Sequence, residues 1–402
     1  MNNEVYFFIE HKTREYESIK KISQILASKY SISSKILSIP FHSHRLVFLK
    51  SPALFLLPYC ISMHDWPFKA IYQHFSSNVA IMNMCWEQLL TKSNKDYKKP
   101  RGQYLLNKIY YIAWNTEFKR YLTDVGVKKD NIEICGNPNL SLLESLKQST
   151  MNISKTIRNR YSICENYKIC FLPMNYAWAF LSQREIKHRI TRGYDREKAE
   201  KYHEISKKSL NMFIDFVSNL AEKHSHLIFV VRPHPGVITT QYKSMFGTRM
   251  SKNIIISSEY SVNEWILASD IVGSSWSTVV HDANLYGKQT FLFQPIPLPD
   301  WLYVDWMDKV PKLKNINEFD ELVYNEKQDR VEKKGFEDDY FENVACFIAK
   351  LTEKQLMNKV SKKSLTLELL LLYLRFFIRS LLSRVHLQNK HLMADYFKVE
   401  NV

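Results

Sequence analysis

Short apolar runs alternate with amphipathic stretches through the first third of the chain. A helical pattern covers Ile19 to Leu26, directly after the first run. The apolar runs are VYFFIE, KILSIP, ALFLLPY, NVAIMNM, YYIAW and IEICG. Continuous apolar runs separated by helical stretches are typical of strands in a parallel sheet that is covered on both faces. The pattern predicts a βαβ domain over residues 1–145.

A second series with the same rhythm fills residues 167–345. Its long charged helix is predicted from about Arg196 to Lys223. Its apolar runs are KICFLPM, HLIFVV, NIIIS, DIVGS and TFLFQ. We interpret the polar, helical segment 146–166 as a linker. The sequence therefore predicts an α/β protein in which two Rossmann-like domains face each other across a cleft.

The remaining residues, 346–402, are predicted to form a helical tail. Ser364 to His386 is strongly apolar, but three charged residues interrupt it, so it falls short of the ~20 clean residues of a transmembrane helix. At about 100° per residue the polar side chains of this segment share one narrow face. They are Glu368, Arg375, Arg379 and His386.

This segment has two interpretations. It fits a helix that lies in a membrane interface, with Lys362, Lys363 and Arg384 touching anionic lipid headgroups. It also fits a helix that packs against a domain or a partner protein.

Composition and charge narrow the class of partner. The 402 residues are 45% hydrophobic and 13% aromatic, which indicates an ordered globular protein. Lysine and arginine number 56 against 41 acidic residues, and the net charge of +15 favours anionic partners. The sequence has neither a basic stripe interleaved with aromatics nor a known nucleic-acid-binding module, so we expect no nucleic-acid partner.

The six cysteines and the first residues indicate the compartment. The cysteines are scattered, with no CxxC pair, so we expect reduced thiols and no metal site. The opening residues MNNEVYFFIEHKTREYE do not form a signal peptide. We expect a cytoplasmic protein.

The segment HLIFVVRPHPG places Arg232 and His234 at the carboxyl end of a predicted strand, where open α/β sheets bind ligands. Most lone histidines are structural, but two flanking prolines hold His234 rigidly outside regular hydrogen bonding. Its imidazole is a candidate contact for a nucleotide phosphate.

A hydroxyl-rich turn is predicted at the start of a later helix. The N-cap needs only one hydroxyl. The remaining hydroxyls, together with the helix dipole, predict a phosphate-binding site. The hydroxyl residues are Ser274, Ser275, Ser277 and Thr278. Asp282 is a candidate contact for ribose hydroxyls or a solvated helix residue. Asn175, which follows a predicted strand, could contact the donor or close a turn.

The first domain offers two candidate bases for an acceptor hydroxyl. Glu87, beside Trp86, is the first choice, and Asp65 is the second. Each could instead be structural. Asn115 is predicted to be a helix N-cap rather than a catalytic residue.

Taken in order, these motifs resemble the surface carbohydrate biosynthesis group of bacterial transferases of the GT-B fold. The resemblance covers roughly residues 55 to 295, with more distant similarity to CDP-glycerol glycerophosphotransferases and to capsule polymerases that use CMP-activated sugars. The motifs that carry it are WEQ (86–88), AWN (113–115), GNP (136–138), KICFLPMNYAW (168–178), RPHP (232–235), WILASD (265–270), the serine-rich turn, Asp282-Ala283 and Gly287-Lys288.

The resemblance implies that His234 and the turn from Ser274 to Thr278 bind the nucleotide phosphate. Asp282 stands where the family usually has glutamate, and Asn139 stands where it commonly has arginine. The sequence contains no DxD motif, and a GT-B transferase needs no metal triad, so we expect neither a metal nor a cofactor.

The leading hypothesis is a metal-independent glycosyltransferase (EC 2.4) of capsule or lipopolysaccharide biosynthesis. It would move a sugar from a nucleotide-activated donor, with a CMP-linked sugar as one option, onto a glycan or lipid-linked glycan at the inner face of the cytoplasmic membrane. The alternatives are a CDP-glycerol-type polyol-phosphate transferase (EC 2.7.8), a non-hydrolysing nucleotide-sugar epimerase on the same fold, and a non-catalytic interaction protein.

Overall fold

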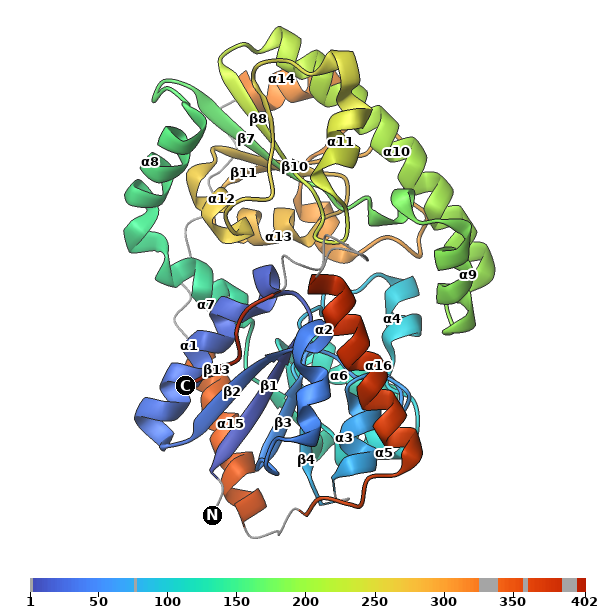
Figure 1. Ribbon diagram of the computed structural model, residues 1–402. Helices are drawn as coiled ribbons and strands as arrows, with labels where there is room; N and C mark the ends of the chain where they lie inside the picture. Colours follow the sequence, from blue (N-terminus) through green and yellow to red (C-terminus); the bar gives the residue numbers. More distant parts are fainter. Residues whose placement is uncertain (1–2, 76–77, 325–338, 357–360, 385–395) are drawn as a thin grey trace. The chain divides into compact units, whose positions relative to one another are not determined.

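Each predicted apolar run forms a strand, and the strands assemble into two separate sheets (Figure 1). The structure is a computed structural model that describes residues 3–75, 78–324, 339–356, 361–384 and 396–402. It divides into two units. The first contains residues 1–88, 98–142 and 336–402, and the second contains 89–97 and 143–335.

The first unit has a seven-stranded sheet in the order β13-β2-β1-β3-β4-β5-β6. Its strands are β1 (Glu4–Ile9), β2 (Ser33–Ser38), β3 (Leu54–Leu57), β4 (Ala80–Asn83), β5 (Tyr110–Ala113), β6 (Ile132–Ile134) and β13 (Glu400–Asn401). All pairs are parallel except β13 with β2. The two-residue strand β13 has too few residues for an apolar pattern, and the sequence analysis missed it.

Both faces of this sheet are covered, which explains the continuous apolar runs. Val5 and Phe7 of β1 belong to a core shared with helices α1 and α15. On the opposite face, Phe8 contacts Phe55 of β3. The helices of the unit are α1 (Lys12–Tyr30), α2 (Ile39–His42), α3 (Phe68–His74), α5 (Gln103–Lys108), α6 (Thr116–Asp124), α7 (Pro138–Ser145), α15 (Tyr340–Leu356) and α16 (Leu367–Arg384), with 3-10 turns η1 (Ser43–Val47) and η2 (Lys129–Asn131).

The second unit has a six-stranded, wholly parallel sheet in the order β12-β11-β10-β7-β8-β9. Its strands are β7 (Lys168–Pro173), β8 (Leu227–Arg232), β9 (Ile254–Ile256), β10 (Ile271–Ser274), β11 (Gln289–Phe293) and β12 (Lys312–Leu313). Its main helices are α4 (Lys92–Lys98), α8 (Thr150–Tyr161), α9 (Gln183–Thr191), α10 (Arg196–Lys223), α11 (Thr239–Phe246), α12 (Val262–Ala268), α13 (Thr278–Leu285) and α14 (Ile316–Tyr324). The long helix α10 has the predicted bounds.

The units divide the chain differently from the predicted domains. The predicted linker 146–166 contains α8, whose Ile157 lies in the core of the second unit. Residues 89–97 also join that unit, where the Ser93 hydroxyl donates to the Tyr194 hydroxyl at 2.8 Å. The predicted tail 346–402 is part of the first unit, because α15 buries Val344 and Ile348 against its sheet.

Helix α16 packs one side against α2, η1 and α3 of the first unit. The Trp66 and Phe376 rings stack with centroids 3.4 Å apart, and the Ser380 hydroxyl donates to the Phe41 carbonyl at 3.1 Å. His74 Nδ1 and the Tyr373 hydroxyl share a hydrogen bond of 2.7 Å. The predicted face residue His386 lies outside the described residues. None of the helices in the described ranges is long and apolar enough to cross a membrane.

Two buried histidines under α16 make the first unit sensitive to acid. Burial lowers the pKa of His42 to about 3 and that of His74 to about 4, and the positive charges of Arg45 and Lys362 lower them further. In the unfolded chain both would titrate near 6.5. Between pH 6.5 and about 4 the unfolded state takes up protons that the folded state excludes. The free energy of unfolding therefore decreases as the pH is lowered through this window.

We therefore expect the thermal midpoint of the protein to fall by roughly 5 °C between pH 7 and pH 5. The double variant His42→Asn/His74→Asn keeps an acceptor near the position of each Nδ1. Its thermal midpoint should fall clearly less over the same pH interval. Differential scanning fluorimetry of both proteins across this range measures the difference. Parallel curves for variant and wild type would show that these two histidines do not carry the effect.

Candidate functional site

The second sheet reverses its direction of growth between β7 and β10. From β7 the chain adds β8 and β9 on one side, and then returns to add β10, β11 and β12 on the other. In open parallel sheets such a switch point leaves a crevice at the carboxyl ends of the two strands, where ligands bind. Here the two ends are followed by Asn175 and by the turn from Ser274 to Thr278.

Ser274 joins the two strand ends. Its fully buried hydroxyl donates to the carbonyl of Pro173, at the end of β7, over 2.7 Å, and it also lies 3.3 Å from Asn175 Oδ1. Gly273 precedes it, and a Cβ at that position would overlap the ring of Phe291. The structure thus brings Asn175 and the serine-rich turn together, and it gives Ser274 a structural role.

The next part of the turn rests on an aromatic side chain that the sequence analysis missed. The buried hydroxyl of Tyr176 is hydrogen-bonded to Ser275 Oγ, and its ring meets Trp276 edge to face with centroids 5.2 Å apart. Tyr176 follows Asn175 directly in the same strand-end segment. The rule that pointed to Asn175, its position after a buried strand, applies equally to Tyr176.

The end of the turn begins α13. Ser277 is the N-cap, and its hydroxyl accepts from the N–H of Val279 at 3.4 Å. Thr278 is exposed at the first helical position, and the first turn of α13 contains no acidic side chain that would offset the positive end of the helix dipole. Asp282 is partly exposed in the next turn, with Oδ1 3.4 Å from His281 Nδ1.

Two donors at this edge lack an acceptor. In the described part of the chain, the buried Nδ2 of Asn175 and Nε1 of Trp276 have no hydrogen-bond partner. A buried donor without a partner costs roughly 1–3 kcal/mol, so each calls for an explanation. Both belong to residues next to the hydroxyls of the switch point, where an acceptor on a bound ligand is one way to satisfy them; the indole N–H groups of Trp66 and Trp306, away from this edge, also have no partner among the described residues.

The RPHP segment follows β8, the strand beside β7. Arg232 is buried and donates to the carbonyl of Ser258, which follows β9, at 3.2 Å. Burial lowers its pKa to about 10. Arg232 is therefore engaged toward β9, and no described contact joins it to the serine-rich turn.

His234 has a defined hydrogen-bonding state. Its Nδ1 accepts from the backbone N–H of Gly236 at 3.1 Å, and Val237 N–H donates to its carbonyl at 2.8 Å. An accepting Nδ1 places the proton of the neutral ring on Nε2.

The first sheet also reverses its growth, between β1 and β3, and charged residues follow β1 there. Arg14 donates to Glu10 at 2.9 Å, to Glu15 at 2.6 Å and to Glu87 at 2.5 Å. Lys98 pairs with the other oxygen of Glu87. The candidate base Glu87 is thus held between two cations, with 47% of its side chain exposed.

Glu15, in the first turn of α1, anchors this cluster, and the sequence analysis did not select it as a site residue. Its side chain is fully buried, and its Oε2 accepts from the Glu10 N–H at 2.9 Å. Burial raises the pKa of the Glu15 carboxyl, while Arg14 opposes the rise.

Asp65 lies in a different setting. Its Oδ2 accepts from the backbone N–H groups of Ile61 and Ser62, each at 2.8 Å, and the residue is 4% exposed. These contacts hold the loop after β3. The predicted cap is confirmed, because Asn115 Oδ1 accepts from the Phe118 N–H at 2.9 Å.

Asn139, which the sequence analysis singled out, receives a hydrogen bond from Ser18 Oγ at 3.0 Å on Oδ1.

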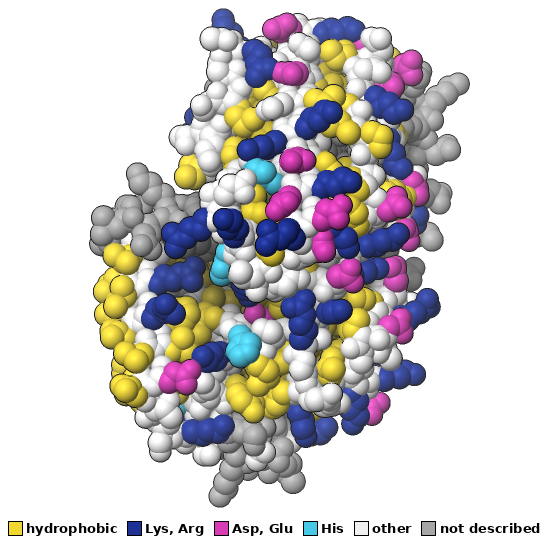
Figure 2. Space-filling model, turned by 90° about the vertical axis from the view of Figure 1, so that its right-hand side faces the viewer, with side chains coloured by type: hydrophobic (Ala, Val, Ile, Leu, Met, Phe, Trp, Pro, Cys, Tyr) yellow, Lys and Arg dark blue, Asp and Glu magenta, His cyan; other side chains and the backbone are white. Residues whose placement is uncertain are grey.

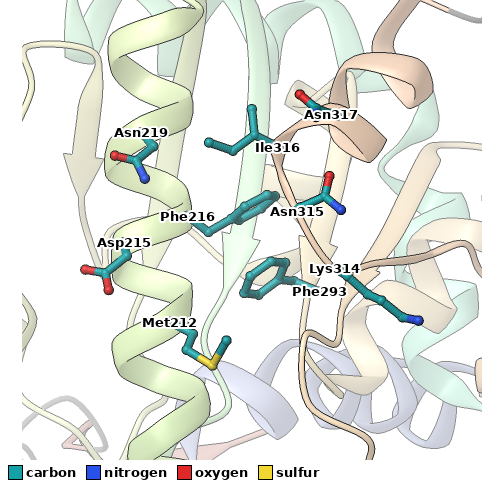
Figure 3. Close-up of a pocket in the computed structure, with 9 residues that line it drawn as sticks. All are labelled: Met212, Asp215, Phe216, Asn219, Phe293, Lys314, Asn315, Ile316 and Asn317. Carbon is teal, nitrogen blue, oxygen red and sulfur yellow. The ribbon is translucent and has the colours of Figure 1, made fainter.

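A hollow of about 420 Å³ lies elsewhere in the second unit, between α10 and the segment from β12 into α14 (Figure 3). The rings of Phe216 and Phe293 stack in it with centroids 4.0 Å apart. Polar side chains, among them Asp215 and Lys314, stand around it. Its lining includes none of the predicted site residues, so it is not part of the candidate site.

No family model matches the sequence, and neither does any curated protein. Solved structures do match. The wall teichoic acid polymerase TagF matches with a TM-score of 0.56 and 13% identity, over 88% of this chain and 89% of that one. The UDP-GlcNAc 2-epimerase from Neisseria meningitidis bound to UDP-GlcNAc matches with a TM-score of 0.53 and 14% identity, over 89% and 100% of the two chains.

A third match is the S. aureus MnaA–UDP co-structure, with a TM-score of 0.56 and 11% identity over 90% and 100% of the two chains. At these identities the matches show the fold. They confirm the predicted GT-B class, in which each unit is a Rossmann-like α/β domain.

The hydroxyls of the turn should separate into structural and ligand-binding groups. Ser274→Ala removes a buried hydrogen bond between β10 and β7, so we expect it to lower the free energy of unfolding by about 1–2 kcal/mol. Thr278→Ala alters an exposed hydroxyl and should change it by less than about 0.5 kcal/mol. Urea denaturation of the two variants measures both values. If Thr278→Ala lowered the free energy of unfolding as much as Ser274→Ala does, the Thr278 hydroxyl would be structural rather than ligand-binding.

Proposed function

We propose that this chain is a GT-B glycosyltransferase that takes a sugar from a nucleotide-activated donor and adds it to a bacterial surface polysaccharide such as capsule or lipopolysaccharide. The single observation that carries the proposal is the β7–β10 switch point. There, two buried donors without acceptors, the side-chain amide of Asn175 and the indole N–H of Trp276, belong to residues next to the exposed Thr278 hydroxyl and the positive end of α13.

Phosphate binding at this edge follows from its chemistry. Thr278 and the first backbone N–H groups of α13 are donors for phosphate oxygens, and the helix dipole favours their negative charge. His234 Nε2–H, at the end of β8, is a further donor, and we propose that Asp282 binds ribose hydroxyls. With these groups the departing nucleotide phosphate is stabilised without a metal ion.

Arg232 supports the same ligand less directly. It is a buried cation with a lowered pKa, so a bound anion nearby would recover part of its lost solvation. We therefore propose that Arg232 also contributes to nucleotide binding.

For the acceptor we propose Glu87 as the base. Its carboxylate is exposed, whereas Asp65 is buried and occupied by two backbone N–H groups. Arg14 and Lys98 orient the Glu87 carboxylate, and an acceptor hydroxyl would have to displace one of these contacts to be deprotonated. The acceptor would be a glycan or a lipid-linked glycan, so we also propose that the enzyme works at the inner face of the cytoplasmic membrane.

One observation favours a second function. The chain covers all of the Neisseria meningitidis epimerase and 89% of TagF, with similar TM-scores. A nucleotide-sugar epimerase would use the same donor site, as would a CDP-glycerol-type polyol-phosphate transferase. Truncating the chain before α16 does not separate these functions, because α16 and β13 pack into the first unit.

Binding of a nucleotide is the first test. We expect one of CMP, CDP, UDP and GDP to stabilise the protein, by about 2.7 kcal/mol at a hundredfold excess over its dissociation constant, and His234→Ala and Thr278→Ala to reduce the shift. Thermal-shift titration measures this. A protein that none of the four nucleotides stabilises would not be a nucleotide-sugar enzyme of this kind.

The role of Glu87 is tested by turnover of the nucleotide sugar that carries the stabilising nucleotide. Glu87→Gln should lower kcat for nucleotide release by at least about 100-fold, because it removes the base. It should leave the nucleotide-induced thermal shift unchanged. Glu144→Gln, at another surface ion pair, is the matched control and should keep full activity.

Three outcomes would contradict this assignment. Unchanged turnover by Glu87→Gln would exclude it as the base. Loss of activity in Asp65→Asn without loss of stability would move the role to Asp65. Conversion of the free donor to its epimer, seen by NMR in the absence of acceptor, would establish the epimerase.

A further inference from the structure

Helix α16 leaves one side uncovered although the side chains on it are large and apolar. Six of its apolar residues after Leu367 have between 43% and 56% of their surface in solvent. They are Leu370, Leu371, Leu374, Phe377, Ile378 and Leu381. The sequence pattern placed the polar residues of this helix on a narrow face and apolar residues around the rest, and the structure divides those apolar residues between a packed side and this open one.

The open side is continuous. At about 100° per residue, its members fall within an arc of roughly 120° that runs the length of the helix. Leu369, Tyr373 and Phe376, on the opposite side, are buried against the first unit. Leu367 extends the open side at the start of the helix, with 73% of its surface exposed. A contiguous apolar strip of this size on an otherwise folded surface marks a binding face.

Positive charge borders the strip. Arg375 and Arg379 are exposed on one flank. Lys362 and Lys363 are exposed just before the helix, where their ammonium groups also donate to the carbonyls of Val47 and Tyr72. Glu368 is the only acidic residue in the sequence of α16, and Lys69 pairs with it at 2.9 Å. Figure 2 shows the same arrangement, with hydrophobic side chains along the left edge of the lower unit and basic side chains next to them.

We infer that this face of α16 binds the surface of a membrane that contains anionic phospholipid. The helix lies in the plane of the interface, with its leucine, isoleucine and phenylalanine side chains among the acyl chains. Arg375, Arg379 and the two lysines contact lipid phosphates. The helix does not cross the bilayer, since its 18 residues include four charged ones.

The flanking charge favours lipid over a second copy of this chain. Two copies that paired through the strip would each bring a net charge of +15 to the interface, and this repulsion opposes association. An anionic bilayer attracts the same charge. The inference gives the enzyme proposed above a specific membrane-binding surface, but it does not depend on the donor or the reaction.

Co-sedimentation of the full chain with vesicles tests the inference. We expect binding to phosphatidylcholine vesicles that contain 30% phosphatidylglycerol, the ratio being about that of an anionic membrane, and much weaker binding to phosphatidylcholine alone. Leu371→Gln/Leu374→Gln/Ile378→Gln should weaken binding by at least about tenfold, because it removes apolar surface from the strip. Met151→Gln/Tyr324→Gln, which removes exposed apolar side chains from the second unit, should bind like the wild type.

Variants of the basic residues test the inference independently. Arg375→Gln/Arg379→Gln should weaken binding to the anionic vesicles by roughly fivefold per residue and should not alter binding to phosphatidylcholine. Because the substituted residues of all these variants are exposed, their thermal midpoints should match the wild type, which checks that they fold. His234→Ala should sediment with vesicles like the wild type, so that failure of the nucleotide site and failure of this surface are distinguished.

Three results would overturn the inference. The first is equal binding of the triple glutamine variant and the wild type to anionic vesicles. The second is equal binding of the wild type to neutral and anionic vesicles. The third is no vesicle binding together with self-association in sedimentation velocity that the triple variant abolishes, which would show that a second copy covers the strip.

Discussion

The reversal of strand order between β7 and β10 is the constraint on which the candidate site depends. It brings the ends of two strands that are about a hundred residues apart in sequence to one edge, and the Ser274 hydroxyl fastens one to the other through the Pro173 carbonyl. The rest of the turn leads into α13, where the Thr278 hydroxyl and the first N–H groups of the helix are donors. The buried amide of Asn175 and indole of Trp276 remain without acceptors, which is a cost that a ligand would remove.

Both sheets reverse their direction of growth at a switch point, but different chemical groups lie at the two switch points. At the switch point of the second unit the groups are donors and a helix N-terminus, which suit an anion. At that of the first unit Arg14 is surrounded by Glu10, Glu15 and Glu87, which suits proton transfer and orientation of a carboxylate. This difference supports a donor role for the second unit and an acceptor role for the first.

Much of the fold could be predicted because every strand pair except β13–β2 is parallel and both sheets are covered on both faces, so that each internal strand is a continuous apolar run. The short edge strands β12 and β13 have no such pattern and were missed. The serine-rich turn and Asn175 were found because they follow buried strands. The return of residues 336–402 to the first unit could not be predicted, because it rests on long-range packing of Val344, Ile348 and Phe376 that leaves no local signal.

We propose that the β7–β10 edge binds the phosphate of a nucleotide. A crystal structure of the protein with the nucleotide that stabilises it most tests this directly. We expect phosphate oxygens within about 3 Å of the Thr278 hydroxyl and the N–H groups that begin α13, with acceptors now facing Asn175 Nδ2 and Trp276 Nε1. A nucleotide bound elsewhere, with these two donors still unpaired, would contradict it.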